Sequence, residues 1–112
     1  MVEIKKLEKD GVNIISVIGE VDASSSIKLD SAIQDVIESG SKKIMVDCSA
    51  LEYISSAGLG VFMSYLEDMK KKKIKFAVAG LNEKVHHVFE ILGLDELLKI
   101  FGTKEEGLKY LL

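Results

Sequence analysis

The chain has 112 residues, enough for one domain, and its mix of 47% hydrophobic and 29% charged residues excludes a disordered polypeptide. A formal net charge of −3 gives no electrostatic attraction to nucleic acid, and a single cysteine, Cys48, excludes an internal disulfide and a cysteine-based zinc site. With no apolar run near the roughly 18 residues of a membrane span and no signal-peptide core, we expect one cytoplasmic domain over residues 1–112.

The first half of the chain predicts a β-hairpin, a helix and a buried strand. Residues 2–8 and 12–19 read as strands on either side of Asp10-Gly11, a pair typical of hairpin turns. Apolar residues then recur at the spacing of one helix face before Gly40, namely Leu29, Ala32, Ile33, Val36 and Ile37. The short apolar run at 43–48 predicts a buried strand, and we expect residues 49–58 to form a loop.

The second half predicts alternating helices and strands. A helix with one apolar face leads through four lysines to a strand over 74–79, so 43–79 is a strand–helix–strand unit with parallel strands. Asn82 is expected to cap a helix that ends at Gly93. A strand near 97–101 should follow, and then a final helix that Thr103 and Glu106 open with a capping box. The inward residues of these helices are expected to be Phe62, Tyr65, Leu66 and Met69, then Val85, Val88, Phe89 and Leu92.

These elements predict an α/β fold in a single domain. It has a mixed sheet of four to five strands, which starts with a hairpin, and about four helices.

The segment from Asp47 to Gly60 is the most informative for function. We expect Asp47 at the carboxyl end of a strand and Ser55-Ser56 just before a helix, at the sheet edge where ligands gather in α/β folds. Free N–H groups and the helix dipole would stabilise a phosphoryl group there, although a serine at this place more commonly only caps the helix. Gly58 and Gly60 are expected to leave the first turn open to another protein.

Enzyme motifs do not fit the chain. A nucleophile elbow requires G-x-S-x-G, but Ile54 stands two residues before Ser56. A phosphate-binding loop requires lysine directly after its final glycine, but Val61 follows Gly60. The adjacent His86 and His87 are expected at the surface, and Cys48 is expected to be a buried residue without an activating base. We therefore predict no enzyme activity, no metal site and no cofactor.

Three motifs in this order and spacing resemble the bacterial anti-sigma-factor antagonists of the STAS domain family. They are G-E-V-D at 19–22, D-C-S at 47–49 and S-S-A-G-L-G at 55–60, and the last is the specific one. The resemblance covers essentially the whole chain and implies a STAS-like fold.

The resemblance implies a binding switch. Such antagonists, when unphosphorylated, bind an anti-sigma factor that is also a serine kinase and so release the sigma factor. Phosphorylation by that kinase, with its ATP as donor, ends the binding, and a serine phosphatase restores it. The implied acceptor is Ser56, and Ser55, which stands where the family usually has aspartate, is its rival.

The resemblance also implies a partner-binding surface and a free form that is a monomer, without nucleic acid or membrane as partners. The residues of that surface would be Glu20, Asp22, Ser55, Ser56, Ala57, Gly58, Leu59 and Gly60.

Two alternatives stay open. In the first, the chain is a STAS module of another kinase-linked pathway. In the second, it binds a nucleotide or a lipid headgroup at the strand edge and the Gly58–Gly60 turn. The second ranks lower because all 15 basic residues are lysine, which leaves no guanidinium group to grip a phosphate. Kinase-dependent labelling of Ser56 favours the antagonist or the kinase-linked module, and saturable ligand binding without a kinase favours the ligand-binding alternative.

Overall fold

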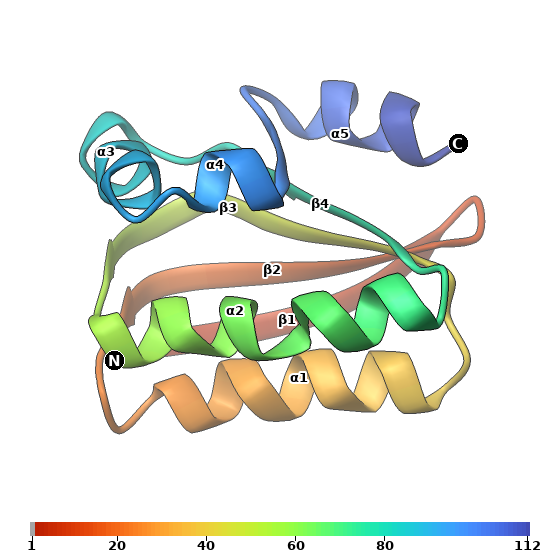
Figure 1. Ribbon diagram of the computed structural model, residues 1–112, viewed down its shortest axis with the longest axis horizontal. Coiled ribbons are helices and arrows are strands. Elements are labelled where there is room, and N and C mark those ends of the chain that lie inside the picture. Colours follow the sequence, from red (N-terminus) through yellow and green to blue (C-terminus); the bar gives the residue numbers. More distant parts are fainter. Residues whose placement is uncertain (1) are drawn as a thin grey trace.

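The hairpin turn at Asp10-Gly11 starts a five-stranded sheet. Both residues have positive φ, 53° and 80°, as a two-residue hairpin turn requires. The turn aligns the first two strands in antiparallel register from Val2↔Gly19 to Lys9↔Val12. A computed structural model describes residues 2–112 (Figure 1).

Within residues 2–112, five strands and five helices follow one another. Their bounds are β1 Val2–Lys9, β2 Val12–Val21, α1 Ser26–Glu38, β3 Lys43–Ile54, α2 Ser56–Lys71, β4 Lys75–Ala79, α3 Glu83–Ile91, α4 Leu94–Leu97, β5 Lys99–Phe101 and α5 Lys104–Leu111. The strands lie in the order β1-β2-β3-β4-β5, antiparallel for the first pair and parallel for the others. This confirms the predicted mixed sheet, the opening hairpin and the parallel β3-α2-β4 unit.

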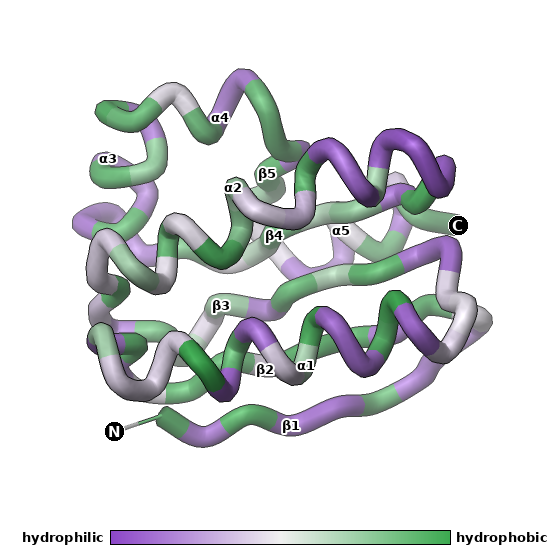
Figure 2. Tube along the Cα trace, turned by 60° about the horizontal axis from the view of Figure 1, so that its bottom comes forward, coloured by the Kyte–Doolittle hydropathy of each residue, from purple (hydrophilic) through white to green (hydrophobic). Residues whose placement is uncertain are grey.

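Helices cover the two faces of the sheet unequally. The large core lies between one face and the helices α1, α2, α3 and α4, and a smaller core lies between the other face and α5. Figure 1 shows α1 and α2 on one side of the strands and α5 on the other. Alternate residues of β3 separate the two cores, since Ile44 and Val46 enter the large one and Met45 the small one. In Figure 2 the apolar segments accordingly concentrate in the central strands and along the inner sides of the helices.

Strand β3 is twice as long as the sequence predicts. Its register with β2 shifts between Ser16 and Ile18 and again between Gly19 and Glu20, so two bulges place extra residues in β3. Cys48, Leu51 and Ile54 are therefore buried at a spacing of three, which hides the alternation of a strand. The expected loop at 49–58 is wrong.

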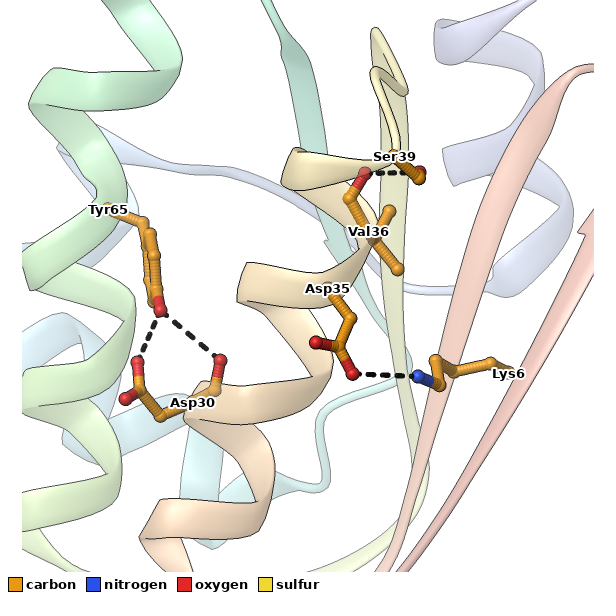
Figure 3. Close-up of polar contacts among 6 residues, drawn as sticks. All are labelled: Lys6, Asp30, Asp35, Val36, Ser39 and Tyr65. Carbon is orange, nitrogen blue, oxygen red and sulfur yellow. Dashed lines mark hydrogen bonds and ion pairs between the residues drawn. The ribbon is translucent and has the colours of Figure 1, made fainter.

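Helix α1 is fixed to its neighbours by side-chain hydrogen bonds (Figure 3). The Tyr65 hydroxyl of α2 donates to the Asp30 carboxylate of α1, and burial together with this bond raises the pKa of Tyr65. On the other side, Lys6 of β1 lies 3.3 Å from the Asp35 carboxylate. The predicted inward stripe of α1 is buried throughout, and Gly40 has the positive φ, 90°, of a residue that follows a helix.

The end of the chain differs from prediction in two respects. Residues 94–97 form the short helix α4, so the last strand begins only at Lys99. Leu92, expected to point inward, is 50% exposed because α3 ends at Ile91 and the chain turns away at Gly93, whose φ is 73°. Asn82 and Thr103 cap α3 and α5 as predicted, by accepting hydrogen bonds from the backbone N–H groups of Val85 and Glu106.

Within residues 2–112, none of the helices combines the length and the apolar character that crossing a membrane requires.

Phe62 is the side chain on which the large core centres. It is 1% exposed, and its ring centroid lies 6.2 Å from that of Phe76 and 5.8 Å from that of Phe89. Replacement by alanine removes these contacts and leaves a cavity, so we expect Phe62→Ala to lower the free energy of unfolding by about 3–5 kcal/mol in urea denaturation. The neighbouring Met63, which is 50% exposed, is the control, and Met63→Ala should change it by less than about 0.5 kcal/mol. Equal losses for the two variants would contradict this packing.

Candidate functional site

Two chain segments that are distant in sequence meet at one end of the sheet. The parallel strands β2 and β3 end together at the pair Val21↔Ile54, and the Ser55 N–H donates to the Val21 carbonyl at 2.8 Å. This bond holds the end of β2 against the start of α2, so the β2–α1 loop, residues 22–25, begins beside that helix. The predicted site residues Glu20, Asp22, Ser55 and Ser56 are thus brought to one edge.

The two serines at the start of α2 have different roles. Ser55 is the N-cap with an extended backbone, and its half-buried hydroxyl accepts a hydrogen bond of 3.2 Å from the Gly58 N–H. Ser56 is the first helical residue, and its side chain is exposed. Ser55 therefore provides the capping that is expected of a serine at a helix start. The Ser56 hydroxyl stays accessible to solvent.

The first turn of α2 favours negative charge at this place. The positive end of the helix dipole points at Ser56, and the first turn contains no acidic residue. A phosphoryl group on the exposed hydroxyl would therefore lie in a favourable field.

Gly58 and Gly60 also differ. A Cβ atom at Gly58 would lie 2.6 Å from Ile54 Cγ1 and 2.8 Å from Val21 Cγ1, so this glycine lets α2 approach the ends of β2 and β3. A Cβ atom at Gly60 would meet nothing within 4 Å, and Gly60 is exposed. The expectation that both glycines leave the turn open to a partner is wrong for Gly58, and Leu59 is likewise buried in the core.

Asp22 organises the loop beside Ser56. Its carboxylate accepts hydrogen bonds from the Ser25 N–H at 2.8 Å and from the hydroxyls of Ser24 and Ser25, each at 2.9 Å. These bonds, the one from the Ser25 backbone first, lower the pKa of Asp22 from 3.8 to about 2. Glu20 is exposed and lies opposite the exposed Tyr53 in the β2–β3 pairing. Asp22 therefore shapes the loop, while Glu20 presents its charge to solvent.

Asp47 is not at the end of its strand, contrary to prediction. It is the last residue of β3 that pairs with β4, opposite Ala79, and β3 continues along β2 for seven more residues to Ile54. Its carboxylate accepts hydrogen bonds from the N–H and the hydroxyl of Ser49. Asp47 thus lies inside the sheet, between β2 and the end of β4, away from the serines, and its carboxylate holds Ser49.

The sequence analysis missed a groove of mixed polar and apolar lining beside Ser56. It is shallow, about 250 Å³, and runs between the first halves of α1 and α2. Ile27 stands on its rim with 68% of its surface exposed, and Ser56, Gly60 and Met63 follow one exposed side of α2 at helical spacing. Ile27 and Met63 both lie off the inward stripes of their helices, which is the signal that would have identified them. The residues that line the groove are Ser26, Ile27, Asp30, Ala57, Gly60, Val61 and Ser64.

The other reactive side chains lie apart from this edge. Cys48 is buried, which together with the nearby Asp47 raises the pKa of its thiol, and His86 and His87 are exposed on α3 as predicted. Among residues 2–112 no three histidine, cysteine, aspartate or glutamate side chains are grouped so that they would hold a metal ion.

Known proteins match most of this chain. An anti-sigma-B factor antagonist of Listeria monocytogenes is 28% identical over 105 residues, which are 94% of this chain and 91% of that protein. An anti-sigma-F factor antagonist of Mycobacterium tuberculosis is 27% identical over 101 residues, 90% of this chain and 82% of that protein. A crystal structure of an anti-sigma factor antagonist from Mycobacterium paratuberculosis superimposes with a TM-score of 0.92 at 25% identity, covering 99% and 94% of the two chains.

The family pattern described as the STAS domain matches residues 3–107. This match covers β1 from its second residue, the other four strands, and the edge formed by the β2–α1 loop and the start of α2. The resemblance drawn from the three sequence motifs is confirmed, and the chain belongs to the STAS domain family.

Proposed function

We propose that the chain is an anti-sigma-factor antagonist whose binding is switched by phosphorylation of Ser56. The observation that carries the proposal is the division between the two serines, in which Ser55 caps α2 and Ser56 offers a free hydroxyl. The names of the curated relatives from Listeria and Mycobacterium support the class of partner. The unphosphorylated chain binds an anti-sigma factor serine kinase and thereby releases the sigma factor.

The chemical step is carried out by the kinase. The Ser56 hydroxyl oxygen forms a bond to the γ-phosphorus of the kinase's ATP, the bond to ADP breaks, and a base of the kinase takes the hydroxyl proton. The chain contributes an accessible nucleophile held on a rigid helix end. Its own role is to bind the kinase and to accept the phosphoryl group. A serine phosphatase reverses the modification.

The partner surface we propose surrounds Ser56. It combines the exposed Glu20 and Ala57, the open backbone at Gly60 and the groove with Ile27 on its rim. Gly58 and Leu59 support this surface from inside.

Phosphorylation acts on the interface and leaves the fold unchanged. A phosphoserine carries about −1.5 to −2 charges at pH 7, which must lose water when the interface closes. The field at the start of α2 stabilises the phosphate in the free chain, so the penalty falls on the complex. A penalty of about 3 kcal/mol weakens binding more than a hundredfold.

The acceptor is tested by intact mass and peptide mapping after incubation with the anti-sigma factor kinase of the same organism and ATP. We expect one phosphoryl group on the wild-type chain and on Ser55→Ala, and none on Ser56→Ala. Loss of labelling only in Ser55→Ala would assign the switch to the capping serine and contradict the proposal. No labelling and no complex with the kinase in its nucleotide-bound state would exclude the antagonist function for this pair.

The two glycines provide a second test. Gly60→Ala adds a methyl group to an open helix surface, so we expect unchanged or higher stability, by up to about 1 kcal/mol, together with at least tenfold weaker binding to the kinase. Gly58→Ala places the same methyl group against Ile54 and Val21, so it should lower the free energy of unfolding. Urea denaturation and calorimetric titration distinguish the effects. Wild-type affinity in a stable Gly60→Ala chain would remove the α1–α2 groove from the interface.

The role of Asp22 predicts an acid transition confined to the loop. Because its pKa is lowered on folding, its hydrogen bonds stabilise the folded loop fully above pH 4, and this contribution is lost as the pH falls through about 2. We expect the amide resonance of Ser25 to titrate with a midpoint near 2 in NMR spectra, and the transition to vanish in Asp22→Asn. A midpoint near 4 would show that the carboxylate is not hydrogen-bonded in solution.

A further inference from the structure

A second groove lies at the end of α2 opposite to Ser56. It is a groove of about 640 Å³ between the last two turns of α2, the start of β4 and the segment from α4 to β5, with Tyr110 of α5 at its side. Its volume falls in the range of small-molecule sites. Ser56 is about 20 Å away along the helix, at 1.5 Å per residue. The groove is therefore separate from the proposed kinase surface.

The groove exists because β5 is short. β5 pairs only with Ala77–Ala79, so Lys75 and Phe76 at the start of β4 have no strand beside them on that side. The helix α4 fills part of this space and leaves Leu97 61% exposed on the rim. The floor is apolar and consists of the half-buried Leu66 and Ile74 above the buried core residues Met69, Phe76 and Leu98.

Positive charge gathers on the rim of this apolar floor. Lys70, Lys75 and Lys99 all line the groove, and in the part of the chain that the structure describes none of them forms an ion pair. The Lys75 ammonium lies 5.6 Å from the centre of the Tyr110 ring, which orients it over an aromatic face.

The carboxylates nearby do not cancel this charge. Glu67 and Glu96 also line the groove, and Glu67 lies 3.4 Å from Lys71 on the outer side of α2. Glu96 is therefore the one glutamate of the lining that remains to oppose the three lysines. The whole chain, by contrast, has a formal net charge of −3. The rim is thus locally opposite in charge to the molecule as a whole and complementary to an anion.

We propose that the groove binds a free long-chain carboxylate. The hydrocarbon chain lies against the half-buried Leu66 and Ile74 and the exposed Leu97, and the carboxylate is held among the three lysine ammonium groups. An amphipathic molecule fits both features, because burial of its chain supplies affinity and the lysines select for negative charge. A recessed groove favours a single dissolved molecule over a flat membrane surface. The proposal is independent of the function assigned to Ser56.

The test is an NMR titration of the full chain with decanoate below its micelle concentration and with uncharged decanol as the matched ligand. We expect saturable shifts of the amides of Leu97, Lys99 and Tyr110 with decanoate, and at least tenfold weaker binding of decanol. Shifts that do not saturate, that map to other residues, or that are equally strong with decanol would overturn the proposal.

Two double variants isolate the lysines of the groove. Lys70→Gln with Lys99→Gln removes two charges from the rim, and Lys9→Gln with Lys84→Gln removes two exposed charges that lie outside the groove. The first variant should weaken decanoate binding at least tenfold and the second less than twofold. Equal effects of the two double variants would show that binding depends only on the net charge of the chain and would overturn the proposal. Co-sedimentation with phosphatidylglycerol vesicles without any decanoate-induced shift would replace the dissolved ligand by a membrane and refute the proposal.

Discussion

The parallel pairing of β2 with β3 is the interaction on which this structure depends. It places the centre of the sheet between the hairpin and the later strands, and it makes both strands end at the pair Val21↔Ile54. The hydrogen bond from the Ser55 N–H to the Val21 carbonyl then carries this alignment beyond the strands. Two bulges in β3 set the register, so that the start of α2 emerges beside the β2–α1 loop. Without this register the serines and the GEVD segment would not share an edge.

Neighbouring residues of the same type serve different ends at this edge. Ser55 and Gly58 build the start of α2, one as the cap and the other by allowing close contact with Ile54. Ser56 and Gly60 do neither and face solvent, where a partner reaches the hydroxyl and the bare backbone. A rigid support with an exposed acceptor explains how one phosphoryl group can change binding without a change of fold.

Helix α2 connects two regions of opposite chemistry. Its N-terminal turn is small, polar and free of acidic residues, which suits an added phosphate, and its C-terminal turns carry Lys70 and Lys71, whose charge complements the negative end of the helix dipole. The same lysine-rich end borders the apolar groove that the short strand β5 leaves open. The proposed kinase surface and the proposed carboxylate site therefore lie at opposite ends of one rigid element.

The sequence alone determined the α/β class, the hairpin at Asp10-Gly11, the caps at Asn82 and Thr103, and the family, because these depend on local turn chemistry, periodicity and motif spacing. Only the tertiary structure decided where β3 ends, since its bulges replace the alternation of a strand by a spacing of three at Cys48, Leu51 and Ile54. The tertiary structure also gave Gly58 and Gly60 different surroundings, and it created both grooves. Burial and cavities arise from segments that are far apart in the chain, and no local pattern records which surfaces those segments leave uncovered.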